Sequence, residues 1–310
     1  MSALHTPVLL EETLEYLAPK EGEHLMVDAT LGEGGHSFAF LSRFDNIKVI
    51  GVDADSGIQE LAKKRLEPFG GRVHFYTQWA QDFFSDYPPA HKKPDTILID
   101  LGVSLYHYEK SGRGFSFRID EKLDMRLNAK EGVSAADILG RISERELADL
   151  LHNNAQERYS RRIANVIVKA RQKGTITTTG ALAALVAQAV PAAYRHGPIH
   201  PATRTFMALR IAVNGELSRL HSLLEGALRV LEPGGRLGVI SFHSLEDRLV
   251  KVFIKEKSKN CTCPPEAPIC KCNGRRSVKI LTPKGITPCR EELVRNPPSR
   301  SARLRVAEKL

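Results

Sequence analysis

The segment from Leu25 to Asp55 decides the fold: LMVDATLGEGGHSFAFLSRFDNIKVIGVDAD. A short apolar run leads into a glycine-rich loop, and a second apolar run ends at Asp53. A strand, a glycine turn, a helix and a second strand closed by a carboxylate are typical of an adenosine-binding α/β unit. The glycines allow the backbone to turn and to approach a ligand closely.

The loop differs from the one that binds dinucleotides. A GxGxxG pattern starting at Gly32 would place glycine at position 37, where this chain has Ser37. The GxGGH version suits a nucleoside ligand without a pyrophosphate, and the Asp53 carboxylate can accept hydrogen bonds from both ribose hydroxyls. The pattern therefore favours S-adenosylmethionine over NAD as the cofactor.

Composition sets the broad class. The chain has 310 residues, of which 42% are hydrophobic and 26% charged, which is ordinary for a globular protein of one large domain or two smaller ones. It has no apolar run as long as a membrane span, and Met1–Pro7 lacks the layout of a signal peptide. We expect a cytoplasmic protein with no membrane partner.

The net charge of +9 is concentrated near the C-terminus. From His243 onwards there are 16 Lys/Arg and 7 Asp/Glu, whereas the rest of the chain has 29 of each. This asymmetry indicates a polyanion partner, most simply nucleic acid, although a solvated basic surface would look the same.

The five cysteines all lie late in the sequence. Four of them form a CxCx6CxC cluster, and Cys289 follows. The cluster could bind zinc, but CxC is tighter than the usual structural spacing, so unliganded thiols are the alternative and we assign no metal ligand. Its members are Cys261, Cys263, Cys270 and Cys272.

The organisation along the chain is that of a parallel sheet interrupted by helices. Strands are predicted at Val73–Tyr76 and Thr96–Leu101, after which no convincing strand occurs until Arg236–Phe242. The intervening helical stretches are Ser134–Asn153, Tyr159–Gln172, Thr178–Val190, and a long pattern from Pro201 to Leu231. Ser143 and Glu146 form a plausible capping box.

These patterns predict an α/β fold with an inserted all-helical domain. We expect residues 1–106 and 209–310 to form a discontinuous cofactor-binding domain and residues 107–208 to form the insert. After a helix at Leu245–Lys257, short strands at Val278–Leu281 and Leu304–Ala307 predict the antiparallel pair with which methyltransferase sheets commonly end.

Ligands of open parallel sheets bind beyond the carboxyl ends of the strands. There the glycine loop would face the methionine half of the cofactor and Asp53 the ribose. Trp79 offers a flat surface for adenine, although a core aromatic is the alternative. Asp100 could bind the cofactor's ammonium or the target base.

Several longer motifs extend over nearly the whole chain. They are HxPVL at His5–Leu9, GEGGHS at Gly32–Ser37, DLGVS at Asp100–Ser104, RGFSF at Arg113–Phe117, LDMR at Leu123–Arg126, HPATRTFxALRIxVNxEL at His200–Leu217, ISFHSLEDR at Ile240–Arg248 and NPPSRSARLR at Asn296–Arg305. Together they resemble the RsmH (MraW) family.

The resemblance implies a class I, Rossmann-like fold and a specific reaction. Members transfer a methyl group from S-adenosylmethionine to the N4 amine of a cytidine near the decoding site (position 1402) of 16S ribosomal RNA in the small subunit. The inserted helical domain would recognise RNA, and a homodimer is a further expectation. The cofactor contacts that the resemblance implies are Gly34, Gly35, His36, Asp53, Trp79, Asp100 and His107.

Two of these positions depart from the family pattern. Trp79 stands where relatives often have phenylalanine, which preserves the aromatic ring. His107 lies in LYHYE, where the family usually has SPQLD, so its contact with the cofactor depends on this alignment alone.

The residue inventory favours an amine over a ring carbon as methyl acceptor. Methylation of cytosine C5 needs a cysteine thiolate, and no cysteine precedes Cys261. The N4 amine needs instead an acceptor for its hydrogens, for which Asp100, Asp124 and His243 are the candidates beside a backbone carbonyl; each could equally be a buried structural group.

The target base must leave its stack to reach such a site. Candidate RNA-facing side chains are Arg113, Phe115, Phe117, Arg126, Arg204 and Arg210, with domain-interface packing as the alternative for the two phenylalanines. Alternative functions are methylation of another nucleic acid position, and a non-catalytic ribosome-assembly factor that retains the cofactor pocket.

Overall fold

The computed structural model describes residues 6–261, 263 and 274–310, and the chain divides into two compact units. The sheet unit comprises Met1–Val103 and Arg219–Leu310, and the helical unit comprises Ser104–Ser218. The second boundary therefore lies ten residues beyond the predicted position 208. It does so because Leu209 and Val213, both beyond position 208, pack in the hydrophobic core of the helical unit.

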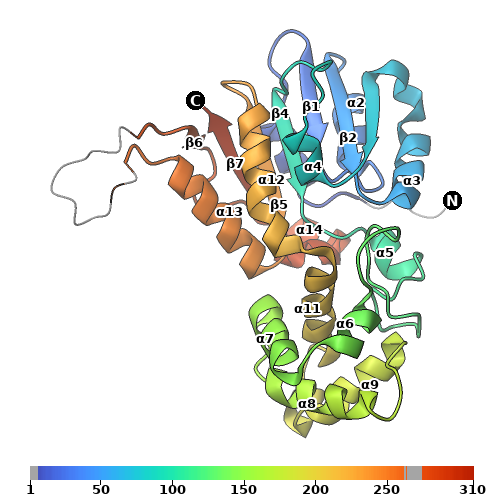
Figure 1. Ribbon diagram of the computed structural model, residues 1–310. Coiled ribbons are helices and arrows are strands. Elements are labelled where there is room, and N and C mark those ends of the chain that lie inside the picture. Colours follow the sequence, from blue (N-terminus) through green and yellow to red (C-terminus); the bar gives the residue numbers. More distant parts are fainter. Residues whose placement is uncertain (1–5, 262, 264–273) are drawn as a thin grey trace. The chain divides into compact units, whose positions relative to one another are not determined.

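The sheet unit contains seven strands in the order β3-β2-β1-β4-β5-β7-β6 (Figure 1). The strands are β1 (His24–Asp28), β2 (Ile47–Asp53), β3 (Val73–Thr77), β4 (Thr96–Asp100), β5 (Arg236–Ser241), β6 (Val278–Ile280) and β7 (Arg303–Lys309). Strands β1 to β5 pair in parallel, whereas β7 is antiparallel to both β5 and β6. The predicted class I α/β fold with its antiparallel pair is confirmed.

Alternating side chains of the strands bury both faces of this sheet, as a parallel sheet requires. Leu25 and Val27 pack with α4 (Ala80–Ser85), α12 (Glu216–Val230) and α13 (Ser244–Lys257). Met26, between them, faces the opposite core. That core is formed with α1 (Leu10–Tyr16), α2 (Gly35–Arg43) and α3 (Ser56–Leu66).

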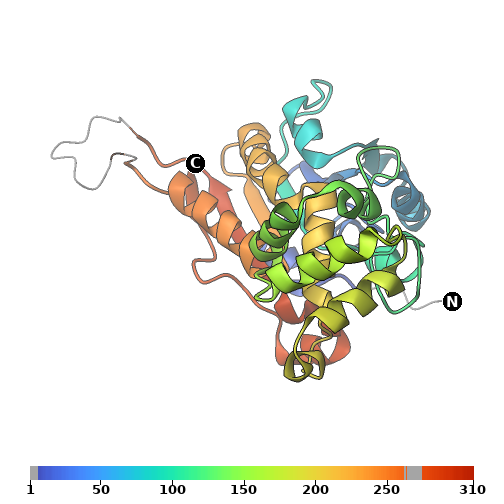
Figure 2. The same cartoon turned by 60° about the horizontal axis from the view of Figure 1, so that its bottom comes forward.

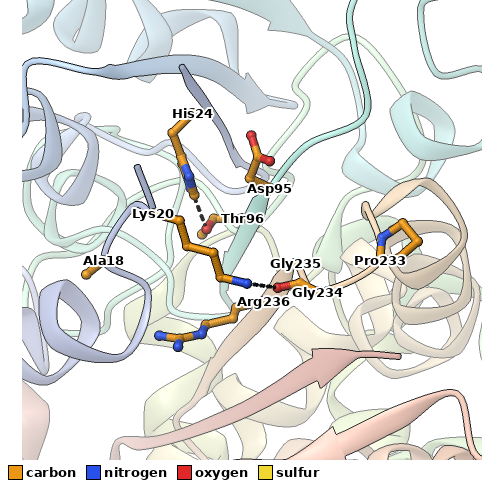
Figure 3. Close-up of a pocket in the computed structure, with 9 residues that line it drawn as sticks. All are labelled: Ala18, Lys20, His24, Asp95, Thr96, Pro233, Gly234, Gly235 and Arg236. Atoms are coloured by element: carbon orange, nitrogen blue, oxygen red, sulfur yellow. Dashed lines mark hydrogen bonds between the residues drawn. The ribbon is translucent and has the colours of Figure 1, made fainter. Parts of the chain in front are cut away.

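The two edges of the sheet carry different groups. Asp28, Asp53 and Asp100 each end a parallel strand, so they share the carboxyl edge. At the amino edge lies a pocket of about 100 Å³, shown in Figure 3, in which a ring nitrogen of His24 lies 2.9 Å from Thr96 Oγ1. That pocket lies at the opposite ends of the strands from the predicted cofactor residues.

The helical unit, seen from below in Figure 2, packs its helices around a core of its own. Its helices are α5 (Leu105–Glu109), α6 (Ala135–Arg141), α7 (Glu144–Ala155), α8 (Ser160–Arg171), α9 (Thr179–Ala189), α10 (Ala192–Arg195) and α11 (Ala202–Asn214). The predicted helix Ser134–Asn153 is two helices, since Ser143 caps α7 through the capping box with Glu146 that the sequence predicts. The long pattern after Pro201 is also two helices, because Gly215 takes the left-handed conformation (φ 60°) and ends α11.

None of the helices in the described parts of the chain is long and apolar enough to cross a membrane. Of the late cysteines, Cys261 and Cys289 are exposed, while Cys270 and Cys272 lie outside the described residues. The helix α14 (Arg290–Arg295) follows Cys289 and precedes the last strand.

Candidate active site

The glycine loop follows β1 and begins α2. Gly34 occupies the N-cap of α2 in the left-handed region (φ 74°), and its amide donates to the carbonyl of Leu31 at 2.8 Å. A Cβ on Gly34 would lie 3.1 Å from the side chain of Leu66, and one on Gly35 would lie 2.6 Å from Pro7 Cγ. Backbone conformation and close packing therefore both require glycine here.

Asp53, the last residue of the neighbouring strand β2, is hydrogen-bonded to the glycine loop. Its Oδ2 accepts a hydrogen bond from the Gly32 amide at 2.8 Å, and its Oδ1 accepts one from the Asp55 amide at 2.8 Å. Asp55 itself caps α3 through the Gly57 amide, so its role is structural. A carboxylate oxygen has two lone pairs, so each oxygen of Asp53 can accept more than one hydrogen bond.

A second acidic group, which sequence reasoning missed, lies under the loop. Asp28 ends β1, is buried, and accepts a hydrogen bond from the Ser37 hydroxyl at 2.7 Å. Burial raises the pKa of Asp28 to about 6, against the lowering effect of that hydroxyl. The sequence contains a pattern that indicates this residue, because Asp28 ends an apolar strand just as Asp53 does.

Asp100 and His36 lie beside this buried carboxyl. The Nδ1 of His36 is 3.9 Å from Asp100 Oδ2, and its Nε2 is 3.0 Å from the carbonyl oxygen of Val8. Asp100 Oδ1 accepts a hydrogen bond from the Gly102 amide at 2.9 Å. Burial raises the pKa of Asp100 to about 6, and the charge of Glu246 acts in the same direction.

Trp79 is the N-cap residue of α4, and its side chain is half-buried. The guanidinium carbon of Arg219 lies 4.1 Å from the centroid of the ring system. Within the described parts of the chain, the buried Nε1 of Trp79 has no hydrogen-bond partner. An unmatched buried donor costs free energy. The flat face of the ring is the part of Trp79 on which a planar ligand could stack.

His243 is fixed at the N-terminus of α13. Its Nδ1 accepts a hydrogen bond from the Glu246 amide at 3.4 Å, and Glu246 Oε2 accepts bonds from the amides of Phe242 and His243 at 2.8 and 3.3 Å. The ring Nε2 lies 3.1 Å from Glu246 Oε1, but the angles of this contact are not those of a hydrogen bond. These contacts are those of a helix cap. They correspond to the structural role that the sequence leaves as the alternative to proton acceptance by His243.

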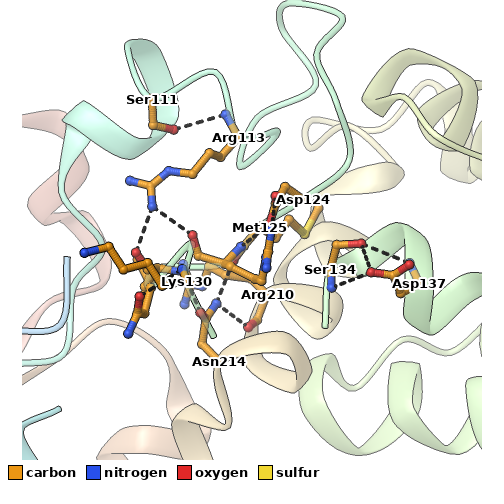
Figure 4. Close-up of polar contacts among 12 residues, drawn as sticks. Ser111, Arg113, Asp124, Met125, Lys130, Ser134, Asp137, Arg210 and Asn214 are labelled. Atoms are coloured by element: carbon orange, nitrogen blue, oxygen red, sulfur yellow. Dashed lines mark hydrogen bonds and ion pairs between the residues drawn. The ribbon is translucent and has the colours of Figure 1, made fainter. Parts of the chain in front are cut away.

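The other candidate proton acceptor, Asp124, lies in the helical unit and is ion-paired (Figure 4). Arg126 donates to its two carboxylate oxygens from Nε and Nη2 at 2.7 and 2.8 Å. Burial alone would raise the pKa of Asp124, but the hydrogen bonds from Arg126 outweigh it, so the pKa is lowered. Asp124 is therefore ionised and already bound to a cation.

His107 also lies in the helical unit, in α5. Its buried ring packs between aromatic neighbours, with centroid distances of 5.6 Å to Tyr106 and 5.2 Å to Phe115. These contacts lie within its own unit, and the predicted contact of His107 with the cofactor stays a prediction.

Most of the side chains predicted to face RNA also make contacts inside the helical unit. Arg113 donates to the carbonyls of residues 126 and 127 at 3.0 and 2.7 Å, as Figure 4 shows. Arg210 pairs with both oxygens of Glu216 at 2.9 and 3.0 Å. Phe115 is buried, and Phe117 stacks on His200 with ring centroids 4.5 Å apart. Arg204 is exposed and donates to the carbonyl of Gln156 at 3.0 Å.

The sequence as a whole matches the family model described as the MraW methylase family over residues 2–310. The chain belongs to this family. It is 56% identical over 310 residues to Ribosomal RNA small subunit methyltransferase H of Treponema denticola, covering 100% of this chain and 98% of the relative. The proteins of the same name from Heliobacterium modesticaldum and Treponema pallidum are 43% and 39% identical, covering 99% and 98% of this chain and 98% and 92% of their own lengths.

Two MraW-family motifs from opposite ends of the chain meet beside the glycine loop. The amide of Leu9, a residue in the left-handed region (φ 53°), donates to Glu292 Oε1 at 2.8 Å. The side-chain amide of Asn296 donates to the carbonyl of Thr6 at 3.1 Å. The C-terminal segment thus positions the residues that pack against Gly35 and His36.

Proposed function

We propose that the protein transfers the methyl group of S-adenosylmethionine to the N4 amine of a cytidine in 16S ribosomal RNA within the small subunit. The observation that carries the proposal is the carboxyl edge of the sheet. There one unit contains a glycine loop bonded to Asp53, a half-buried planar ring at Trp79, and a half-buried carboxyl of raised pKa at Asp100. The relatives' shared name supports a small-subunit ribosomal RNA as substrate.

The residues at this edge fit the cofactor. Asp53 would accept the ribose hydroxyls, Trp79 would stack on the adenine, and the loop at Gly34 and Gly35 would lie against the methionine half. When bound, S-adenosylmethionine supplies an electrophilic methyl group on a sulfonium, so no covalent enzyme intermediate is needed.

Asp100 is the proton acceptor that the contacts favour. The lone pair of N4 is conjugated with the cytosine ring, so an acceptor must draw on the amine hydrogens as the new bond forms. With a pKa of about 6, Asp100 is ionised at neutral pH and more basic than an ordinary carboxylate. Asp124 is committed to Arg126, and His243 caps a helix.

One experiment tests the reaction and its alternatives. Methyl-labelled S-adenosylmethionine is incubated with the protein and with small subunits that lack the modification, and the RNA is digested to nucleosides. Label in N4-methylcytidine supports the proposal. Label in another nucleoside would indicate a different target position, and unlabelled RNA that still binds the protein would indicate an assembly factor.

A parallel incubation with protein-free 16S RNA shows whether the assembled subunit is the substrate. The homodimer and the cytoplasmic location stay predictions. Light scattering of the purified chain, with and without RNA, measures the first, and fractionation of cells measures the second.

A further inference from the structure

The charges of the helical unit are unevenly distributed along its sequence. Residues 158–215 contain nine lysines and arginines and no aspartate or glutamate. Residues 104–157 of the same unit contain eight lysines and arginines and ten acidic residues. A tract of 58 residues that contains basic but no acidic residues indicates a positively charged surface suited to binding a polyanion.

Part of this tract forms a cluster of cations and aromatic rings where α7 meets α8. The guanidinium carbon of Arg158 lies 5.1 Å from the ring centroid of Tyr159 and 5.0 Å from that of Tyr194. The two tyrosine rings meet edge to face, with centroids 4.9 Å apart. Arg162 lies 6.0 Å from the Tyr159 ring. Both arginines are exposed, and both rings are half-buried.

The cluster is fixed from beneath by a carboxylate that does not reach the surface. Glu157 is fully buried; its Oε1 accepts a hydrogen bond from the Tyr159 amide at 2.8 Å and its Oε2 accepts one from the Tyr194 hydroxyl at 2.9 Å. Arg204, also exposed, donates from Nη1 to the carbonyl of Gln156 at 3.0 Å. Glu157 therefore fixes the Tyr194 ring through its hydroxyl and the backbone of Tyr159 through its amide.

We propose that this arginine–tyrosine corner (Arg158, Tyr159, Arg162, Tyr194 and Arg204) binds the RNA substrate outside the base that is methylated. The proposal deepens the proposed function and rests on it. In the described part of the chain, no carboxylate lies within salt-bridge distance of Arg158, Arg162 or Arg204, so their charges are available to phosphates. The adjacent rings favour RNA over other polyanions, since unpaired bases stack on tyrosine and on guanidinium planes.

The first test compares two double variants of equal charge change. Arg158→Gln/Arg162→Gln removes two cations of the corner, and Arg141→Gln/Arg145→Gln removes two exposed cations from α6 and α7, near Asp137 and Asp149. Each is titrated with small subunits lacking the modification, over a range of salt concentrations. We expect the corner variant to bind about tenfold more weakly, with a salt slope smaller by about 1.5, and the control to bind as the wild type does.

Equal binding by the corner variant, or equal losses in both variants, would overturn the proposal. A second pair separates stacking from structure, because Tyr159→Phe keeps the ring while Tyr159→Leu removes it. Weaker RNA binding by Tyr159→Leu alone, at unchanged melting temperature, supports stacking on a base. A lowered melting temperature with unchanged RNA affinity would assign the cluster to stability instead.

The binding readout is independent of methyl transfer. If wild-type protein binds subunits through the corner but labels no cytidine, the proposed function fails and the corner stands. If it labels cytidine and the corner variants bind normally, the corner fails and the function stands.

Discussion

The backbone amide of Gly32 donates a hydrogen bond to Oδ2 of Asp53 at 2.8 Å. Two features far apart in the sequence motif, the glycine loop and the carboxylate of the next strand, are therefore one structural unit. The loop is held in place by the same group that we propose binds the ribose. A change at Asp53 must consequently affect both the ligand contact and the loop.

Substitution of Asp53 by Asn should weaken S-adenosylmethionine binding about 30-fold, because an amide offers one acceptor oxygen where the carboxylate offers two. Isothermal titration calorimetry measures the change. Asp45→Asn, at an exposed acid that precedes the same strand, is the matched control and should bind normally. Equal affinity in Asp53→Asn would contradict the ribose assignment.

Trp79 is the sole tryptophan of the chain, so its fluorescence reports on the proposed adenine site alone. Adding S-adenosylmethionine should change the emission, since a purine on the ring would alter its contact with Arg219. Trp79→Phe should retain most of the affinity by calorimetry, whereas Trp79→Leu should lose about tenfold for want of a stacking surface. If saturating S-adenosylmethionine does not change the emission, Trp79 is not part of the cofactor site.

Methyl transfer should decline as the pH falls through about 6, because Asp100 then takes up a proton and can no longer accept one. Single-turnover rates from pH 5 to 8 measure this profile. Asp100→Asn should lower the rate by at least about 100-fold at pH 7.5. A rate that is flat across this range in the wild type would argue for another acceptor.

The same carboxyl predicts an effect on stability with a definite sign. Its folded-state pKa of about 6 exceeds the ordinary aspartate value of 3.8, so between these values the native state binds more protons and stability falls as pH rises. Above pH 6 the buried charge costs about 3 kcal/mol. Asp100→Asn should therefore raise the free energy of unfolding at pH 7.5, measured by urea denaturation, and leave it unchanged at pH 3.

Asn214 should be essential for the stability of the helical unit. Its side chain donates to the carbonyls of Met125 and Arg210 at 2.8 and 2.9 Å and accepts from the Leu127 amide at 2.8 Å, which fixes Met125 in the left-handed region (φ 63°). Asn214→Ala should cost about 3 kcal/mol of unfolding free energy, because these buried groups lose their partners. Asn153→Ala, at an exposed position of α7, should change stability by less than about 0.5 kcal/mol.

Glu292 should affect cofactor binding although it lies at the other end of the chain from the glycine loop. Glu292→Ala leaves the buried amide of Leu9 without its acceptor, which costs about 1–3 kcal/mol and loosens the segment packed on Gly35 and His36. We expect a lower melting temperature and weaker S-adenosylmethionine binding. Glu292→Gln retains an acceptor oxygen, so its melting temperature and cofactor affinity should match those of the wild type. If the negative charge of Glu292 were what matters, Glu292→Gln would lose both as Glu292→Ala does.

The strand pattern was predictable because it follows from local chemistry. Apolar runs ending in carboxylates at Asp53 and Asp100 indicate buried parallel strands, and Ser143 with Glu146 forms the capping box that their spacing predicts. The break at Gly215 was not recognised, since an apolar helical pattern continues on both sides of it. Asp28 also ends an apolar strand, but only the structure shows that its carboxylate is buried.

The sequence by itself determined the order of the elements, the carboxyl-edge motif and the membership of the MraW family, because these depend on residue types at short spacings. Only the tertiary structure decided which charged groups are available for chemistry. Nothing in the sequence distinguishes Arg113, Arg126 and Arg210 from Arg158 and Arg162. In the structure, the first three donate hydrogen bonds to carbonyl or carboxylate oxygens of their own unit. Whether an arginine side chain is exposed to solvent or bound to a partner inside the protein depends on long-range packing, which a local sequence pattern does not contain.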